Sequence, residues 1–430
     1  MDKTVRFYYV HRHSYLLIFF VPNQDTVAVV PQEVLEIILG NLDRFKDRES
    51  LRQCALTARC LLPAAQRALF RSISLTTIYE SKGCAGIENF RGLLEQAPHL
   101  ANYPTHLCLD LQPSDWGELL FDAGSYPFVI SRLQNLERMD ICIFRENRIG
   151  LTSLQLYILL GGTQAPKIRC LQLSGMESKE AFGFVGHLAA HRSLQELQLW
   201  DVLPTETQAP ALTWSPLPAV PTVQLRTFHV DGNVTNTLSW ATSANSCLRF
   251  TELRELTIGD LTEQSCPPLA RVLEAAKDSL TCLNFMGPDI EFVSSFQFDM
   301  LRHLRTISYT IPRIGPTISY HSPLGPSSVL NPWCSALKRG NGLKLDKFIV
   351  RMDFGTVRIP SRSESEWDPA DGFVFHSWED FEAALISGTR TRQLELQIVD
   401  SNRRITTDVL RDYLSLCHSG TGASSLCCRE

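Results

Sequence analysis

Leu194-Gln-Glu-Leu-Gln-Leu199 and Leu253-Arg-Glu-Leu-Thr-Ile258 are the clearest copies of a hexapeptide, L-x-x-L-x-L, whose recurrence decides the fold. Looser or weaker copies occupy Leu107–Leu111, Leu136–Ile141, Ile168–Leu173, Leu225–Val230, Leu280–Phe285, Leu304–Tyr309 and the segments around Leu345 and Leu394. From Leu136 to Leu304, successive copies start 32, 26, 31, 28, 27 and 24 residues apart. Four of these six spacings fall within the period of about 20–29 residues that is typical of some repeat proteins, and the other two are longer. This pattern predicts about ten units from residue 104 onward.

Each hexapeptide predicts a short strand, because its apolar residues alternate with polar ones and alternate residues of a strand share a face. One copy alone cannot bury that face, so the copies are expected to pair as parallel strands, with the first leucine under the preceding turn. The segments between copies have helical periodicity, for example Lys179–Ala190 and Pro268–Ala276. The prediction is an α/β fold with parallel inner strands and outer helices; a doubly wound α/β domain shares this alternation and is the competing fold.

Upstream of the copies, the segment Val30–Leu75 predicts three short helices that lead into a strand. Pro31 suits the first helical position, where its missing N–H costs nothing. Ser50-Leu-Arg-Gln53 has the form of a capping box that starts a second helix, and Pro63 starts a third. In the first helix, apolar residues spread beyond one stripe, which is more than a single intramolecular contact needs. Part of this surface is therefore expected to bind a partner.

Two parts of the chain resemble known families. The segment Val30–Leu75 resembles a fungal-type F-box through Val30-Pro31-x-Glu33, Ile37-Ile38-x-x-x-Leu42, Leu51-Arg52-x-Cys54-Ala55-Leu56, Arg59 and Pro63-Ala-Ala-x-Arg67-x-Leu69-Phe70. Leucine usually stands in place of Val30, and tryptophan in place of Leu61. The hexapeptides resemble irregular leucine-rich repeats, which often accompany F-boxes, although the asparagine that usually follows the strand is absent from nearly every copy.

The resemblance implies a small N-terminal three-helix F-box unit followed by a curved leucine-rich-repeat solenoid. It implies docking of the F-box on a Skp-family adaptor, and through it on a cullin scaffold, with the chain as the substrate receptor of an SCF-type cullin-RING ubiquitin ligase. The repeats would bind an unknown protein target. The alternative is a leucine-rich-repeat interaction scaffold without a role in ubiquitin transfer, in which the helical unit only caps the first repeat.

We predict four regions: residues 1–27 as an N-terminal tail or strand, 28–75 as the F-box-like unit, 76–418 as the repeat domain and 419–430 as a C-terminal tail. Within the repeat domain, proline-rich, glycine-rich and serine-rich stretches at 204–221, 311–333 and 353–378 predict surface loops or distorted repeats. Thr406–Leu416 predicts a capping helix.

Binding residues are predicted on both parts of the chain. The expected adaptor contacts are apolar: Val30, Pro31, Leu35, Ile38, Leu42 and Leu51. The expected target contacts lie between the buried strand positions, on the concave face: Asp110, Trp200, His229 and Asp231. Trp200 is the preferred anchor, because tryptophan is enriched among interface hot spots; packing against the next repeat is its equally weighted alternative.

Composition excludes several functional classes. The net charge of −5 comes from 41 basic and 46 acidic residues mixed along the chain, so we expect no nucleic-acid or membrane partner. The apolar run Tyr15–Val21 is far shorter than the roughly 20 residues that span a bilayer. Thirteen cysteines without a C-x-x-C pair or a four-ligand zinc spacing favour reduced, mostly buried thiols of a cytoplasmic or nuclear protein.

Catalytic motifs are equally absent from the sequence. There is no phosphate-binding loop, dinucleotide fingerprint or nucleophile elbow. His187 and His191 lie one helical turn apart, but Leu188 stands where a metalloprotease helix needs its glutamate. We therefore predict that the chain is not an enzyme and has no catalytic residue, metal or cofactor.

Overall fold

The computed structural model describes residues 34, 37–39, 42, 47–57, 61–76, 85–111, 125–143, 150–151, 168–175, 177–178, 193–204, 222–244, 246–259, 261–287, 293, 296–311, 326–339, 343–353, 381, 384–385, 391 and 393–399. The chain divides into two compact units. Unit 1 comprises residues 1–144 and 161–168, and unit 2 comprises residues 145–160 and 169–430. The predicted tails at 1–27 and 419–430 and the capping helix at 406–416 lie outside the described residues.

The N-terminal part of unit 1 is helical, as the sequence predicts. Residues 34 and 37–39 are helical, and the helices α2 (Arg48–Thr57) and α3 (Leu62–Phe70) follow. Their buried core consists of Leu39, Leu51, Leu61, Ala64 and Ala65. Proline occupies the first turn of α3, which confirms the predicted start of that helix.

The predicted capping box at the start of α2 is wrong. The helix begins at Arg48, and the N–H of Leu51 donates to the carbonyl oxygen of Asp47 at 2.9 Å. Ser50 therefore lies inside the first turn. The Gln53 amide donates to the Glu49 carboxylate at 2.8 Å, one helical turn back, instead of reaching the backbone of Ser50.

The remainder of unit 1 is a parallel sheet with helices. Its strands are β1 (Ser72–Thr76), β2 (His106–Leu111) and β3 (Arg138–Ile143), in that spatial order. Its helices are α4 (Ala85–Gln96), the 3₁₀ helix η1 (Pro98–Asn102) and α6 (Ser125–Arg132). The guanidinium of Arg91 in α4 lies over the ring of Phe128 in α6, 5.3 Å from its centroid. This contact joins the two helices.

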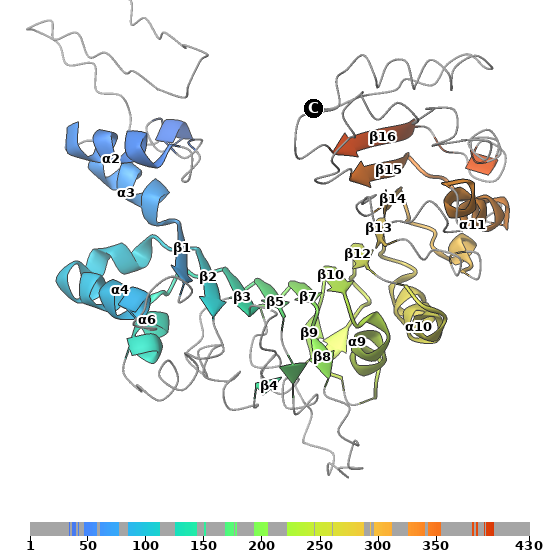
Figure 1. The fold of residues 1–430 in the computed structure, drawn as a ribbon, viewed down its shortest axis with the longest axis horizontal. Helices are drawn as coiled ribbons and strands as arrows, with labels where there is room; N and C mark the ends of the chain where they lie inside the picture. Colours follow the sequence, from blue (N-terminus) through green and yellow to red (C-terminus); the bar gives the residue numbers. More distant parts are fainter. Residues whose placement is uncertain are drawn as a thin grey trace, which may run out of the picture. The chain divides into compact units, whose positions relative to one another are not determined.

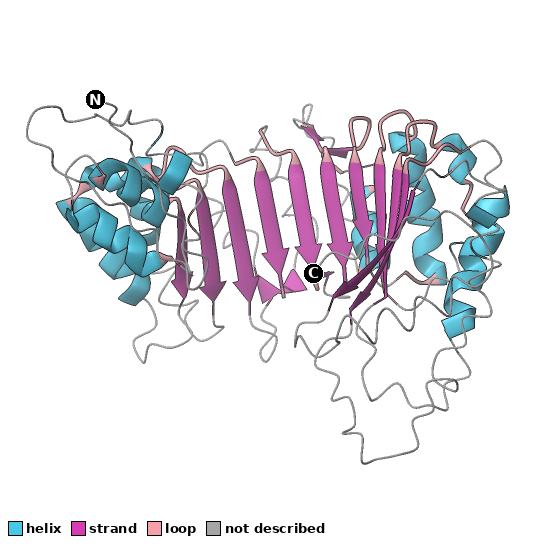
Figure 2. Cartoon of the chain, turned by 90° about the horizontal axis from the view of Figure 1, so that it is seen from above, coloured by secondary structure: helices cyan, strands magenta, loops and turns pink. Residues whose placement is uncertain are grey.

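Unit 2 contains parallel strands with helices along one side of them (Figure 1). Its strands, in spatial order, are β5 (Cys170–Ser174), β7 (Glu196–Trp200), β10 (Thr227–Asp231), β12 (Glu255–Ile258), β13 (Cys282–Met286), β14 (Thr306–Ile311), β15 (Lys347–Asp353) and β16 (Gln393–Val399). Its helices are α9 (Val234–Ala241), η5 (Glu263–Ser265), α10 (Cys266–Ala276), η7 (Phe298–Met300) and α11 (Pro326–Arg339). Neighbouring strands in each unit run in the same direction (Figure 2).

Two small sheets complete unit 2. One consists of β4 (Gly150–Leu151), β6 (Glu177–Ser178) and β8 (Leu203–Pro204), and the other of β9 (Val223–Gln224) and β11 (Leu248–Arg249). No hexapeptide predicted these two-residue strands. None of the described helices combines the length and the apolar character needed to cross a bilayer.

The predicted α/β fold with parallel strands is confirmed, and every hexapeptide copy contains a strand. In β7 the residues Leu197 and Leu199 are buried while their neighbours are half-buried, as the alternation requires. The first leucine of that copy, Leu194, is also buried. The predicted helix Pro268–Ala276 is confirmed as α10, whereas Lys179–Ala190 falls outside the described residues.

The predicted loop at 311–333 ends earlier than expected, because α11 begins at Pro326 and continues through Pro332. A proline inside a helix costs about 3 kcal/mol. The buried residues Trp333, Ala336 and Leu337 recur at helical spacing on the following turns. Burial of this apolar face offsets the cost of the proline.

Candidate functional site

Two of the predicted target contacts, Trp200 and His229, form an aromatic pair across neighbouring strands of unit 2. Their ring centroids are 3.9 Å apart and the planes are inclined by 32°. The indole N–H of Trp200 donates to Oε1 of Gln198 at 3.5 Å. Trp200 thus packs against the next strand, as one alternative proposed, yet remains half-buried at the surface of the sheet. We call this tilted, stacked pair on β7 and β10 the aromatic platform.

His229 is held in its neutral form. Burial lowers the pKa of its imidazole to about 4. Nε2 is buried and has no hydrogen-bond partner among the residues that the structure describes. A neutral ring in this position supplies a stacking surface for Trp200 and carries no charge at neutral pH.

Beside this platform, hydrogen bonds link the polar residues of β12 and β13. The Asn284 amide donates to the Glu255 carboxylate and to the hydroxyl of Thr257, both at 3.1 Å. Thr257 is the register partner of His229. Hydrogen bonds therefore fix the polar groups on the strands next to the aromatic pair.

The predicted contact Asp231 has a local structural role. Its Oδ1 accepts the backbone N–H of Gly232 at 2.8 Å. Gly259 lies against it, and a Cβ atom built there would overlap the Asp231 carboxylate. The absence of a side chain at Gly259 is thus what lets this carboxylate occupy the turn after β10.

Gly259→Ala is expected to destabilise the protein by about 1–3 kcal/mol, because Asp231 must give up its bond to Gly232 to make room. The matched control is Gly92→Ala in α4, where an added Cβ meets no atom within 4 Å. That change should stabilise the protein by about 0.5–1 kcal/mol through helix propensity. Urea unfolding followed by circular dichroism measures both. The same sign for both variants would contradict this account of Gly259.

The sheet of unit 1 has its own polar chain, which ends at Asp140. The Ser72 hydroxyl donates to Nδ1 of His106 at 2.7 Å, and Nε2 of His106 donates to Asp140 at 2.8 Å. Nε of Arg138 donates to the same carboxylate at 2.9 Å. The order serine, histidine, aspartate is also that of a catalytic triad. Here, however, Arg138 forms an ion pair with the aspartate and neutralises its charge. These hydrogen bonds link the three strands β1, β2 and β3 of unit 1.

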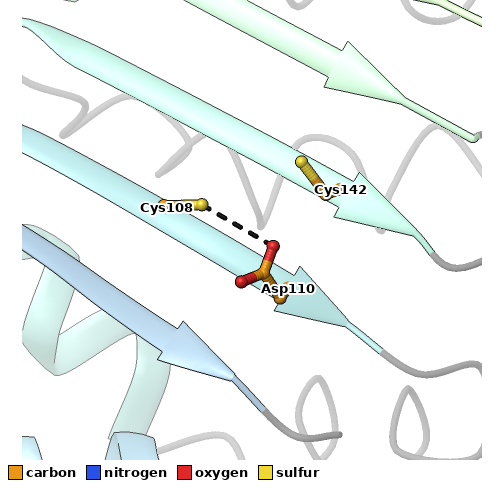
Figure 3. Close-up of side chains that lie close together, drawn as sticks. All are labelled: Cys108, Asp110 and Cys142. Atoms are coloured by element: carbon orange, nitrogen blue, oxygen red, sulfur yellow. Dashed lines mark hydrogen bonds between the residues drawn. The ribbon is translucent and has the colours of Figure 1, made fainter. Parts of the chain in front are cut away.

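On the same sheet, Asp110 meets two thiols (Figure 3). One donor atom each of Cys108, Asp110 and Cys142 lie within 4.8 Å of one another. The Cys108 thiol donates to Oδ1 of Asp110 at 3.7 Å. Interaction with Cys142, together with burial, raises the pKa of the Cys108 thiol, whereas interaction with Cys108 lowers the pKa of Cys142. Asp110, predicted as a target contact, belongs to this cluster.

Sequence reasoning missed the thiol pair because the two cysteines are far apart in the chain. The signal that could have found them is position: Cys108 lies between Leu107 and Leu109 of one copy, and Cys142 directly follows the last residue of the next copy, between Ile141 and Ile143. Such positions share one face of a parallel sheet. The paired histidines His187 and His191 lie outside the described residues.

The predicted adaptor contacts need revision where the structure describes them. Leu51 is fully buried in the core of the helical unit, so it cannot offer a contact surface. Leu42 is half-buried and packs against that core, and Ile38 is half-buried. Helical periodicity selected these residues because it identifies the core stripe first. The structure does not describe Val30, Pro31 or Leu35.

Other residues of the helical unit expose apolar surface. The large apolar side chains exposed in the described part of the chain are Val34 at 41%, Ile37 at 66%, Leu56 at 80% and Leu62 at 37%. Val34 and Ile37 are three residues apart and so share one face of the first helix. Leu56 and Leu62 flank the connection between α2 and α3. We call these four residues the exposed apolar set.

Comparison with known proteins adds no family assignment. No protein-family model matches the chain, and no curated protein matches its sequence.

Proposed function

We propose that this chain is the substrate-recognition subunit of an SCF-type cullin-RING ubiquitin ligase. In this proposal, the helical unit docks on a Skp-family adaptor and the repeats bind a protein target. The observation that carries the proposal is the exposed apolar set. All of its members lie between residues 34 and 62, within the segment that resembles an F-box. A small helical unit that exposes such residues gains stability when a partner covers them.

The placement of Leu61 supports this proposal. Leu61 occupies the position where an F-box usually has tryptophan, and it is 3% exposed within the core of the helical unit. Leucine in place of tryptophan at this position therefore changes the volume of the core. It leaves the exposed apolar set available for docking.

The strand arrays supply the second half of the proposal. Regular spacing of the hexapeptides and parallel pairing of their strands agree with a leucine-rich-repeat solenoid. The platform of Trp200 and His229, with the polar groups beside it, is our candidate surface for the target. Ubiquitin transfer would then follow from proximity, because the receptor raises the effective concentration of a target lysine near a ubiquitin carrier bound elsewhere.

The double variant Ile37→Asp with Leu56→Asp tests the docking step. Two central hot-spot residues contribute about 2 kcal/mol or more each, so capture of a purified Skp-family adaptor by the full chain should be lost. Both side chains are mostly exposed, so the fold should persist by circular dichroism. The matched control is Asn89→Asp with Gln96→Asp, which adds the same charge at exposed positions of α4.

Adaptor capture by the control should equal that of the unchanged chain. Undiminished capture by the Ile37 and Leu56 variant would reject the exposed apolar set as the docking surface. If the unchanged chain itself captures no adaptor, the ligase proposal fails. The alternative of an interaction scaffold outside ubiquitin transfer would then be preferred.

A further inference from the structure

The cluster of Cys108, Asp110 and Cys142 follows directly from strand register. Asp110 in β2 is the register partner of Cys142 in β3, so the two side chains stand next to each other on neighbouring strands. Cys108 precedes Asp110 by two residues and therefore lies on the same face of β2. Three side chains that can bind a metal are thus placed at the corners of a small triangle by backbone pairing alone (Figure 3).

The separation of the donor atoms suits a tetrahedral ion. Zinc binds cysteine sulfur at about 2.3 Å and carboxylate oxygen at about 2.0 Å, which places sulfur and oxygen about 3.5 Å apart in a tetrahedral site. Cys108 Sγ and Asp110 Oδ1 are 3.7 Å apart. One donor atom of each of the three residues lies within 4.8 Å of the other two. We propose that Cys108, Cys142 and Asp110 bind a zinc ion, with a water molecule as the fourth ligand.

A neighbouring hydroxyl group orients one of the three ligands, Asp110. The Ser74 hydroxyl donates to Oδ2 of Asp110 at 3.5 Å, which leaves Oδ1 directed toward Cys108. Ligating carboxylates are commonly oriented by such outer hydrogen bonds. Asp140 is the register partner of Cys108, but its two oxygens already accept from His106 and Arg138. Asp140 is therefore not a ligand in this proposal.

Thiolate ligands select zinc over the hard cations magnesium and calcium, which prefer oxygen. The bound ion would cross-link β2 to β3 within unit 1 and stabilise their pairing, because binding to the folded state shifts the unfolding equilibrium. This inference is independent of the ligase proposal. Neither the adaptor nor a target has to bind for the site to form.

Cobalt(II) provides the test, since it occupies zinc sites and reports tetrahedral thiolate ligands by its visible absorption. The full chain, reduced and free of metal, should bind cobalt with the charge-transfer band of thiolate ligation, and zinc should abolish that band. Cys108→Ser with Cys142→Ser should remove this signal. Asp110→Asn, nearly isosteric, should weaken binding at least about tenfold.

The matched control is Cys282→Ser. Cys282 is also half-buried on a strand and donates to the residue two positions later, Asn284, at 3.5 Å, but this partner is an amide. The control should keep the full cobalt signal and the rise of the thermal unfolding midpoint with zinc, whereas Asp110→Asn should lose most of that rise. The site is rejected if the unchanged chain gives no thiolate–cobalt band. It is equally rejected if the double cysteine variant or Asp110→Asn keeps both responses.

Discussion

Trp333→Ala is expected to lower the free energy of unfolding of unit 2 by about 3–5 kcal/mol, as is usual when a buried tryptophan is truncated. Trp333 is fully buried and projects from α11 into the sheet. It stacks on Phe298 with centroids 6.1 Å apart, and it meets Phe285 and Phe348 edge-on at 5.4 and 5.2 Å. Alanine would leave a cavity between α11, η7 and the strands β13 and β15, and each of these ring contacts would be lost.

Trp333→Phe distinguishes the contribution of side-chain packing from that of the buried indole N–H. The indole N–H of Trp333 is buried without a hydrogen-bond partner among the described residues, so phenylalanine removes an unsatisfied donor while it retains most of the volume. Its cost should be about 1.5 kcal/mol or less. Urea unfolding followed by far-ultraviolet circular dichroism measures these changes. Lys338→Ala, exposed on the same helix, is the control and should have almost no effect. A similarly small effect of Trp333→Ala would show that α11 does not anchor the sheet.

The parallel strands could be predicted from the sequence because their information is local and repeated. Leu197 and Leu199 are buried for the same reason as Leu256 and Ile258: alternation along a strand places both residues of each pair on one face. The helix around Trp333 could not be predicted in this way. Its prolines indicate a loop locally, and the helix is stabilised by packing against aromatic residues of β13 and β15 that local sequence does not reveal.

The candidate sites show the same division between local and distant information. Periodicity placed Leu51 on the apolar face of its helix, but it could not distinguish the core from a docking surface, since both are apolar. The choice of Trp200 and His229 as surface residues followed from their alternation with buried ones. The stacking of these two rings and the proximity of Cys108 to Cys142 depend on which residues pair across neighbouring strands. The spacing of residues in the sequence does not determine that pairing.

His229 should make unit 2 less stable as the pH falls. The ordinary pKa of histidine is about 6.5, and burial lowers that of folded His229 to about 4. Between these values the unfolded chain binds a proton that the folded chain does not, so the free energy of unfolding decreases as the pH decreases. The total loss attributable to this group is roughly 3 kcal/mol. Its contribution is complete above about pH 6.5 and does not change further below about pH 4.

His229→Phe tests this linkage, because phenylalanine keeps a ring for Trp200 to stack on but does not titrate. Urea unfolding at pH 7 and at pH 4.5 should show a smaller decrease for His229→Phe than for the unchanged chain, by roughly 2–3 kcal/mol. His303→Gln removes an exposed histidine and should retain the full decrease. The face of the sheet that carries His229 also carries Glu196, Glu255 and Asp231, but burial of the imidazole is the cause that lowers its pKa. Equal pH dependence in all three proteins would mean that solvent reaches His229 in the folded state, and the aromatic platform would then be open on the side of β10.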